Sequence, residues 1–359
     1  MNNFEFSRAT DVADAVRQIT TEPGAAFIAG GTNLIDLIKE GVTKPSRLVD
    51  ITRLGLDRIE DTSDGGLRIG ALVPNSDLAY HPEIAKRYPL LASAILAGAS
   101  PQLRNMASTG GNLLQRTRCF YFYDTTTPCN KREPGSGCSA IDGLNRMYAI
   151  LGASEHCIAT HPSDMCVALA ALEARVLAAG RNGERSIAFA DFHRLPGDTP
   201  QIDTNLSKDE IITALELPPD GFAKNYSYLK IRDRLSYAFA LVSVAAGLEI
   251  ENGMIRQARL VLGGVAHKPW RDREAEAQLS GAPAARESFM RAAETLLNDA
   301  RGFGHNDFKI ELARRAIMRA LSQAANGTPQ SQIDKRSDRP GGKSRPRACG
   351  QRNWRKPLP

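Results

Sequence analysis

Two periodicities of apolar residues alternate along the first 220 residues. Apolar side chains recur every three or four positions at 11–20 and again at 75–98, and each pattern predicts a helix. Residues 56–73 instead alternate apolar with polar positions around the sequence SerAspGlyGly, which is typical of a β-hairpin. Further strands are expected at residues 25–28, 47–52, 175–178, 185–189 and 210–217. Helices and strands are therefore mixed along this part of the chain.

The pattern resets after the sequence ProProAspGly, which predicts a domain boundary near Asp220. Beyond it, residues 240–250 and 255–265 are two apolar strands joined by GluAsnGly, a sequence that favours a type I′ hairpin turn. The flanking elements are a strand at 226–232 and helices at 274–279, 285–298 and 308–325. The predicted fold class is α+β.

Composition separates a C-terminal tail, residues 326–359, from the two predicted domains at residues 1–220 and 221–325. The tail contains nine Lys/Arg, two Asp, several Pro and Gly and few apolar residues, so we expect it to be disordered. It carries a charge of +7 in a chain of net charge +6, which leaves −1 on the two domains. The charge therefore gives no indication of a folded nucleic-acid-binding surface. The longest apolar run, 237–248, is too short to span a membrane.

Two Gly-Gly sequences lie about eighty residues apart, at Gly30-Gly31 and at Gly110-Gly111. The first follows an apolar strand and precedes a predicted helix that begins near Asn33. At such a turn, glycine lets backbone N–H groups approach an anion closely. Together the two loops can enclose a diphosphate without any lysine. The alternative is that both are ordinary tight turns, because neither matches the GxGxxG or P-loop pattern.

Four of the six cysteines lie close together, with spacings C-x9-C-x8-C-x18-C: Cys119, Cys129, Cys138 and Cys157. Disulfides would need an oxidising compartment, and the N-terminus shows no secretory signal. Zinc sites usually contain C-x2-C pairs, which are missing here. A loop rich in Pro and Gly can surround an iron-sulfur cluster without such pairs. A last alternative is that some of the four are merely buried small apolar residues. The spacing alone leaves these explanations open.

Few other residues suggest chemistry, and no acid/base pair or nucleophile-base arrangement is evident. Asp164 is expected either to cap the helix that follows it or to accept a hydrogen bond from a ribose hydroxyl. Ser163 is the other candidate for that cap. Cys166 is expected in the core, and His267 is expected to have a structural role.

Taken together, these motifs resemble the FAD-binding subunit of molybdenum hydroxylases, the group of xanthine dehydrogenase and aldehyde oxidoreductase. The resemblance covers residues 1–325, and its most specific parts are PheIleAlaGlyGlyThrAsnLeu, SerThrGlyGlyAsnLeu and LeuGlyGlyValAlaHisLysProTrpArg. The cysteine segment is most similar to the flavin subunit of three-subunit bacterial aldehyde oxidoreductases, which also holds a 4Fe-4S cluster.

The resemblance implies a fold and a set of binding residues. The expected fold is a PCMH-type FAD-binding domain, like that of vanillyl-alcohol oxidase, built from two α+β subdomains and containing an iron-sulfur loop at residues 116–160. A C-terminal α+β domain like that of the carbon monoxide dehydrogenase flavoprotein follows it. The residues implied to bind FAD are Ile28, Ala29, Gly30, Gly31, Thr32, Asn33, Leu34, Ser108, Thr109, Gly111, Asn112, Asp164 and Lys230. The implied cluster ligands are Cys119, Cys129, Cys138 and Cys157.

The resemblance also implies a function. The chain would be an electron-transfer oxidoreductase subunit without catalytic acid/base residues of its own. It would accept electrons from 2Fe-2S centres of a small partner subunit, after substrate oxidation on a large molybdopterin-binding subunit, and pass them through FAD to an external acceptor. No nucleic acid or membrane is expected as a partner. The expected compartment is the cytoplasm, or the periplasm by co-export with a signal-bearing partner. The alternative function is a non-enzymatic, metal-stapled interaction subunit.

Overall fold

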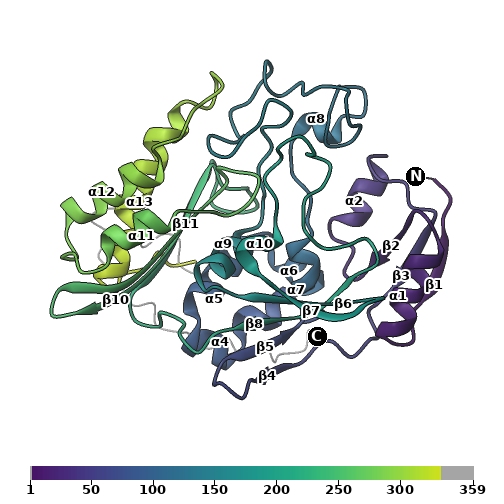
Figure 1. The fold of residues 1–359 in the computed structure, drawn as a ribbon, viewed down its shortest axis with the longest axis horizontal. Coiled ribbons are helices and arrows are strands. Elements are labelled where there is room, and N and C mark those ends of the chain that lie inside the picture. Colours follow the sequence, from purple (N-terminus) through teal and green to yellow (C-terminus); the bar gives the residue numbers. More distant parts are fainter. Residues whose placement is uncertain (1, 333–359) are drawn as a thin grey trace, which may run out of the picture.

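The computed structural model describes residues 2–332, so the part of the predicted disordered tail beyond Gln332 lies outside the described residues. Three β-sheets organise the described part of the chain (Figure 1). Together with the helices that cover them, they confirm the predicted mixture of helix and sheet. None of the helices within residues 2–332 is long and apolar enough to cross a membrane.

The first sheet is parallel and three-stranded, in the order β1-β3-β2. Its strands are β1 (Glu5–Arg8), β2 (Ala25–Ile28) and β3 (Arg47–Asp50). Helix α1 (Val12–Thr21) connects β1 to β2, and Asp11 caps it by accepting a hydrogen bond from the Asp14 N–H. Strand β2 then leads through the first Gly-Gly loop into α2 (Leu34–Lys39). The predicted strand-turn-helix is therefore confirmed.

The second sheet is antiparallel, with strand order β4-β5-β8-β6-β7. Its strands are β4 (Ile59–Asp61), β5 (Leu67–Gly70), β6 (Arg175–Gly180), β7 (Gly183–Ala188) and β8 (Ile211–Leu217). The helices between them are α6 (Pro101–Met106), α7 (Thr109–Leu113), α8 (Phe120–Tyr123), α9 (Asp164–Ala171) and α10 (Phe189–Phe192). Helix α9 is buried along its whole length and forms the centre of this domain.

Residues 75–98 are mostly helical, as predicted, and the chain forms three short helices there. They are α3 (Asn75–Tyr80), α4 (Pro82–Arg87) and α5 (Pro89–Ala97). Pro82 and Pro89 each occupy the first position of a new helix. Proline lacks an N–H and disfavours helical backbone in the residue before it, so each proline ends one helix and begins another.

The third sheet, of the C-terminal domain, is antiparallel in the order β12-β11-β10-β9. Its strands are β9 (Tyr226–Ile231), β10 (Val242–Glu251), β11 (Met254–Gly263) and β12 (Trp270–Arg271). Helices α11 (Arg273–Leu279), α12 (Arg286–Leu296) and α13 (Phe308–Ala325) pack with it. Asn252 and Gly253 both have positive φ, 50° and 77°, which confirms the predicted type I′ turn.

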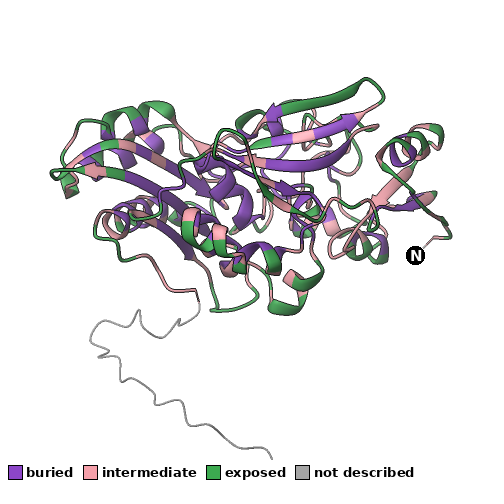
Figure 2. Ribbon diagram, turned by 90° about the horizontal axis from the view of Figure 1, so that it is seen from below, coloured by how far each residue is buried: buried purple, intermediate pink, exposed green. Residues whose placement is uncertain are grey.

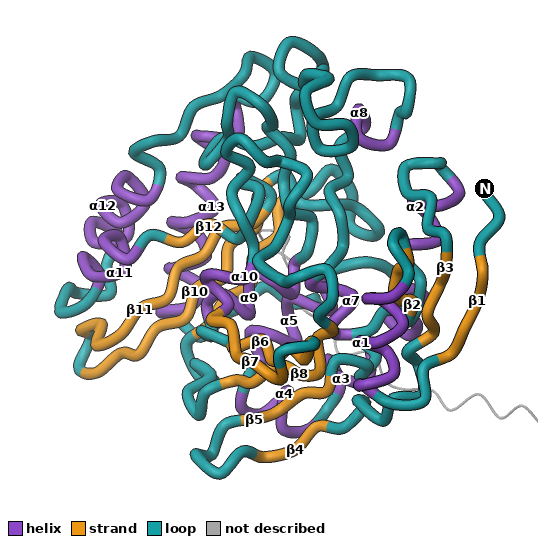
Figure 3. Tube along the Cα trace, turned by 45° about the vertical axis from the view of Figure 1, so that its right-hand side comes forward, coloured by secondary structure: helices purple, strands orange, loops and turns teal. Residues whose placement is uncertain are grey.

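Buried residues run continuously between the two domains (Figure 2). The core of the first domain includes Tyr228, Ala245 and Val261 from the third sheet, packed with α9. The cysteine segment, residues 116–160, has little regular structure and lies between the C-terminal helices and α2 (Figure 3). Its residues Ile150 and Leu151 belong to the core of the C-terminal domain. The segment is therefore built into both domains.

Candidate cofactor-binding site

A cavity of about 1270 Å³ lies where the two Gly-Gly loops meet the C-terminal domain. Its walls are the first Gly-Gly loop, part of the second, the helices α5 and α6, the start of the cysteine segment, and the loop at 233–239. The lining is mostly apolar, with polar groups concentrated at the loops. A cavity of this size and character is suited to a large organic cofactor.

The first Gly-Gly loop carries the free hydrogen-bond donors of the cavity. All residues from Ala29 to Leu34 line it, and none of their backbone N–H groups donates a hydrogen bond to a described residue. These residues are only half-buried. A row of six unpaired N–H groups beside a cavity is a ready site for an anion, because each group needs an acceptor and consecutive N–H groups favour negative charge. The Thr32 hydroxyl adds a further donor, since it donates to none of the described residues.

The two loops touch at Gly30, where glycine is required. A Cβ atom built at Gly30 would lie 1.7 Å from the Met106 carbonyl oxygen. Gly31 has φ +70°, so the turn that leads into α2 also favours glycine. Glycine is therefore needed at Gly30 because the two loops are in contact there, and at Gly31 because of its backbone conformation.

The second Gly-Gly loop differs from the expectation, because its backbone donors are already used. The N–H groups of Thr109 and Gly110 donate to Val73 and Ala71 carbonyls, and that of Gly111 donates to the Ser108 hydroxyl oxygen. Thr109 is fully buried and lies outside the cavity lining, with its hydroxyl donating to the Val73 carbonyl at 2.8 Å. The loop is thus a short capped helix, α7, and the Ser108 hydroxyl is the donor that it still offers to the cavity.

The two predicted asparagines hold the cavity walls together. Asn33 accepts a hydrogen bond from the Arg116 N–H at 2.8 Å, which ties the first loop to the cysteine segment. Asn112 donates to Asn75 at 2.5 Å and accepts from the Ser163 hydroxyl at 2.6 Å. Both side chains line the cavity, but their main contacts are with other parts of the protein. Their amides position the loops.

Asp164 and Lys230 form a buried ion pair beside the cavity. Lys230 Nζ lies 2.7 Å from Asp164 Oδ2, and the Tyr228 hydroxyl donates to Asp164 Oδ1 at 2.7 Å. Burial raises the pKa of Tyr228 well above its usual range, so this hydroxyl keeps its proton. The cap of α9 is Ser163, which accepts from the Cys166 N–H, so the expectation that Asp164 is the cap is wrong. The pair links the two domains, because Asp164 begins α9 and Lys230 lies in β9.

The lining also contains four arginines outside the predicted set of FAD-binding residues: Arg104, Arg116, Arg118 and Arg234. Arg104 donates to the Gly98 carbonyl at 2.6 Å, while its Nε is buried without a partner. Arg118 lies over the Phe239 ring, 5.3 Å from its centroid. The lining therefore contains several basic side chains without any cluster of lysines, together with acidic ones such as Asp36, Glu40 and Asp233. Ser100 caps α6, and the basic residue Arg104 lies four positions later in the same helix. This position was the feature of the sequence that could have indicated Arg104.

The four clustered cysteines meet at one small pocket. Cys119, Cys129, Cys138 and Cys157 all line it, and all four are free thiols. Cys129 and Cys138 are paired across an isolated β-bridge. The four are absent from the described groups of three or more metal-ligating atoms within 4.8 Å of one another. Four thiolates on one zinc ion would be closer than that, because each Zn–S bond is about 2.3 Å. The spacing therefore disfavours a single zinc ion.

The surroundings of these sulfurs combine burial with hydrogen-bond donors. Burial raises the pKa of Cys157 to about 12, against the opposing effects of the Lys131 charge and the Ala159 N–H, which lies 3.5 Å from the sulfur. Burial also raises the pKa of Cys119 and Cys138, and backbone N–H groups again oppose it. Backbone N–H groups directed at sulfur are typical of iron-sulfur sites, where they stabilise thiolate charge.

Asp203 braces the cysteine segment. Its carboxylate pairs with Lys131 and Arg116, and the His267 ring lies 3.6 Å from it. Burial would raise the pKa of Asp203, but the charges of Lys131 and Arg116 lower it to about 2. Lys131 is almost fully buried and also donates to the Pro200 carbonyl at 2.7 Å. This network fixes the loop that carries Cys129. His267 donates from Nδ1 to the Arg194 carbonyl oxygen at 2.8 Å, in keeping with its expected structural role.

Comparison with known protein families gives two matches that together cover most of the chain. Residues 2–220 match the family described as FAD binding domain in molybdopterin dehydrogenase. Residues 226–324 match the CO dehydrogenase flavoprotein C-terminal domain.

Individual relatives extend over nearly the same residues. The chain is 52% identical to the aldehyde oxidoreductase FAD-binding subunit PaoB of Escherichia coli K12, over 90% of this chain and 99% of the relative. It is 28% identical to the glyceraldehyde dehydrogenase medium chain of Sulfolobus acidocaldarius, over 77% of this chain and 81% of that one. The solved carbon monoxide dehydrogenase of Hydrogenophaga pseudoflava contains a chain of similar fold, with TM-score 0.72, 23% identity and coverage of 91% of this chain and 98% of that one.

Proposed function

The chain belongs to the FAD-binding subunits of the molybdenum hydroxylases, and from that premise we propose that it holds FAD and a 4Fe-4S cluster in an aldehyde-oxidising complex. The predicted family and fold are confirmed. The observation that carries the FAD proposal is the row of unpaired N–H groups from Ala29 to Leu34 beside the cavity. Aldehyde as the substrate class is supported by the similarity to PaoB.

The residues of the cavity fit FAD in charge and in shape. The diphosphate would be held by the N–H groups of 29–34 and by the hydroxyls of Thr32 and Ser108. Lys230 and Asp164 would approach the sugar or the flavin, with their mutual charges already compensated. When bound, FAD supplies the exchange of electrons between one-electron centres and a two-electron acceptor. The described chain provides no general base for this role, and its residues bind and orient the cofactor.

The four cysteines fit an iron-sulfur cluster better than the alternatives raised by the sequence. They line one pocket, their spacing disfavours a single zinc ion, and backbone N–H groups lie against three of the sulfurs. Cys119, Cys129, Cys138 and Cys157 would each supply one thiolate. Since Asn33 connects the first Gly-Gly loop to the cysteine segment, the cluster would sit on a segment fixed directly to the FAD site.

We infer that the partners are a large molybdopterin-binding subunit and a small 2Fe-2S subunit, with an external electron acceptor. The names of the relatives support this, because they are a subunit and a medium chain of larger enzymes. The alternative, a non-enzymatic metal-stapled interaction subunit, would leave the large cavity and its free N–H groups without a ligand. The cavity therefore favours the flavoprotein.

The proposal is tested by the cofactor content of the full chain, purified without oxygen. We expect one FAD, four irons and four sulfides per chain. Each of the changes Cys119→Ser, Cys129→Ser, Cys138→Ser and Cys157→Ser should remove iron and leave FAD bound. Cys349→Ser is the control, because Cys349 lies far from the four cysteines in the sequence, and it should retain both cofactors.

Two results would contradict parts of the proposal separately. Flavin without iron, in protein never exposed to oxygen, would remove the cluster and leave the family assignment intact. A colourless protein that does not take up added FAD would contradict the flavin function and favour the interaction subunit. In the assembled complex, aldehyde should bleach the flavin absorbance, and failure of every aldehyde to do so would contradict the substrate class.

A further inference from the structure

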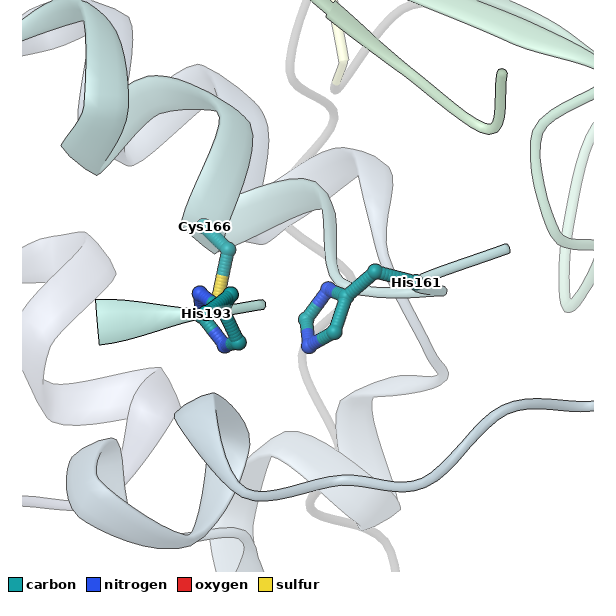
Figure 4. A group of neighbouring side chains, drawn as sticks. All are labelled: His161, Cys166 and His193. Carbon is teal, nitrogen blue, oxygen red and sulfur yellow. The ribbon is translucent and has the colours of Figure 1, made fainter. Parts of the chain in front are cut away.

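A second group of metal-ligating side chains lies apart from the four cysteines. His161, Cys166 and His193 point toward one another (Figure 4), and one ligating atom from each lies within 4.8 Å of those of the other two. The two imidazole rings are 4.4 Å apart between centroids. The three residues come from separate parts of the chain: the loop before α9, α9 itself, and the residue after α10. Nothing in the proposed function uses them.

Both histidines have a buried ring nitrogen without a hydrogen-bond partner. These atoms are His161 Nε2 and His193 Nδ1. His193 is only 3% exposed, and its Nε2 lies 2.9 Å from the Leu113 carbonyl oxygen. That carbonyl can only accept, so the proton of His193 is on Nε2 and the lone pair is on Nδ1. A histidine that donates its other N–H to a backbone carbonyl is the usual arrangement around a bound metal.

The two histidines are already in the neutral state that binds metal ions, whereas Cys166 must lose its proton. Burial lowers the pKa of His193 to about 4 and that of His161 well below its usual range, so both rings are neutral at pH 7. Burial raises the pKa of Cys166 to about 12, so the thiol keeps its proton until a metal ion displaces it. Binding would then release one proton to solvent and change no oxidation state.

We propose that Cys166, His161 and His193 bind one thiophilic metal ion, and that this ion is Cu(I). One thiolate and two imidazoles are soft or borderline ligands, which select Cu(I) or Zn(II) over Mg(II), Ca(II) or Mn(II). Cu(I) with one thiolate is neutral, whereas Zn(II) with one thiolate keeps a charge of +1. A net charge is costly in a buried site.

The neighbouring groups do not supply the missing negative charge for zinc. Asp203 acts on both rings and Asp164 acts on Cys166, but both carboxylates are already paired, Asp203 with Lys131 and Arg116 and Asp164 with Lys230. The described residues offer three ligating atoms in this group, while structural zinc sites are almost always four-coordinate. A metal ion can bind His161 Nε2 only when the proton of the ring is on Nδ1. Nδ1 then no longer accepts the long hydrogen bond of 3.4 Å from the Ser163 N–H.

The ion would have a structural role close to the FAD site. It would join the start of α9 to the residue after α10, and His193 in turn contacts Leu113 at the end of the second Gly-Gly loop. Ser163, which caps α9 above Cys166, donates to Asn112 of the same loop. The metal ion would therefore stabilise the part of the cavity wall formed by Ser163 and Asn112 without entering the cavity itself.

The test is a competition titration of the full chain with Cu(I) under anaerobic conditions, with a chromophoric Cu(I) chelator setting the free concentration. Wild-type protein should bind one more Cu(I) than Cys166→Ala and than His193→Gln, with an affinity loss at this site of at least about a hundredfold. The matched control is His267→Gln, a buried histidine outside the group, which should bind as the wild type does. The difference between variants isolates this site from the four other cysteines, whether or not they hold iron.

Two further readouts keep the result independent of folding defects. X-ray absorption at the copper edge of the wild type should show one sulfur and two nitrogen neighbours, and Cu(I) should raise the melting temperature of the wild type but not of Cys166→Ala. Equal Cu(I) stoichiometry in wild type and variants, or coordination by sulfur alone, would overturn the proposal. A one-ion difference seen with Zn(II) and not with Cu(I) would uphold the ligands and overturn the choice of ion.

Discussion

At the scale of single residues, the contact between the two Gly-Gly loops depends on Gly30. Adding a methyl group there would place it 1.7 Å from the Met106 carbonyl oxygen, so the loops would have to move apart by more than 1 Å. We predict that Gly30→Ala weakens FAD binding by roughly a hundredfold, because misplacing binding groups by about 1 Å has effects of that size. Fluorescence titration of flavin-free protein with FAD measures this.

The control for Gly30→Ala is Gly65→Ala, in the turn between β4 and β5, where a new Cβ atom has no neighbour within 4 Å. It should bind FAD within about threefold of the wild type, because the backbone strain of alanine at φ +83° is confined to a turn that does not line the cavity. Equal affinities of Gly30→Ala and wild type would show that the loop contact is not needed for the cofactor.

A second residue-scale prediction concerns Asp203. Asp203→Asn would leave the buried Lys131 ammonium and the Arg116 guanidinium without their carboxylate, which we expect to lower the free energy of unfolding by about 3 kcal/mol. Urea denaturation measures this. Asp198→Asn, whose side chain is 97% exposed beside His156, should change it by less than about 0.5 kcal/mol.

The same carboxylate predicts a dependence on pH. The pKa of Asp203 is lowered to about 2 in the folded protein, while an aspartate in the unfolded chain has a pKa of about 3.9. The unfolded state therefore takes up a proton first as the pH falls, so the stabilisation present above pH 4 is lost between about pH 4 and pH 2. In denaturation curves over this range, Asp203→Asn should lose less stability than the wild type. Parallel pH profiles would show that the ion pair contributes no stability.

At the scale of elements, the sequence predicted strands and hairpins better than helix boundaries. The GluAsnGly turn was identified correctly because its two positive φ values need those residue types. Residues 75–98 were predicted to be mostly helical without internal boundaries, and the structure divides them at Pro82 and Pro89. The sequence pattern also made the two Gly-Gly loops appear equivalent. Only the structure shows that the N–H groups of the second loop already donate to Val73, Ala71 and Ser108. Val73 and Ala71 are distant in the sequence, and the contact with Ser108 depends on the conformation of the local turn.

The cysteine segment depends on helix α13 through Lys309, which no sequence pattern indicated. This buried lysine donates to the carbonyls of Met147, Tyr148 and Gly264 at 3.2, 2.7 and 2.6 Å. Lys309→Met would leave the Met147 and Gly264 carbonyls without this donor, while Tyr148 keeps its contact with the Asn306 amide, and we expect a loss of about 3 kcal/mol in the free energy of unfolding. Limited proteolysis should then cut the segment at 120–145 at least about ten times faster than in wild type. Unchanged cleavage would show that other contacts hold the segment.

At the scale of the whole molecule, the two domains share a core and both contribute to the cavity. The first domain supplies the Gly-Gly loops and Asp164, while the second supplies Lys230 and the loop at 233–239. We predict that residues 1–220, expressed alone, will neither unfold cooperatively nor bind FAD, because Tyr228, Ala245 and Val261 would be missing from their core. Calorimetry and flavin titration of this fragment measure both properties. A fragment that melts cooperatively and binds FAD would contradict the shared core.

The assignment of the cavity to FAD depends on the first Gly-Gly loop binding a diphosphate. The most direct test compares ADP with adenosine as competitors of FAD for flavin-free protein, because the two differ only in the diphosphate. We expect ADP to compete at least about a hundredfold more strongly, since two charge-assisted hydrogen bonds contribute about 3 kcal/mol or more. In Gly30→Ala the difference should shrink. Equal competition by ADP and adenosine in the wild type would contradict the role assigned to the N–H groups of Ala29 to Leu34.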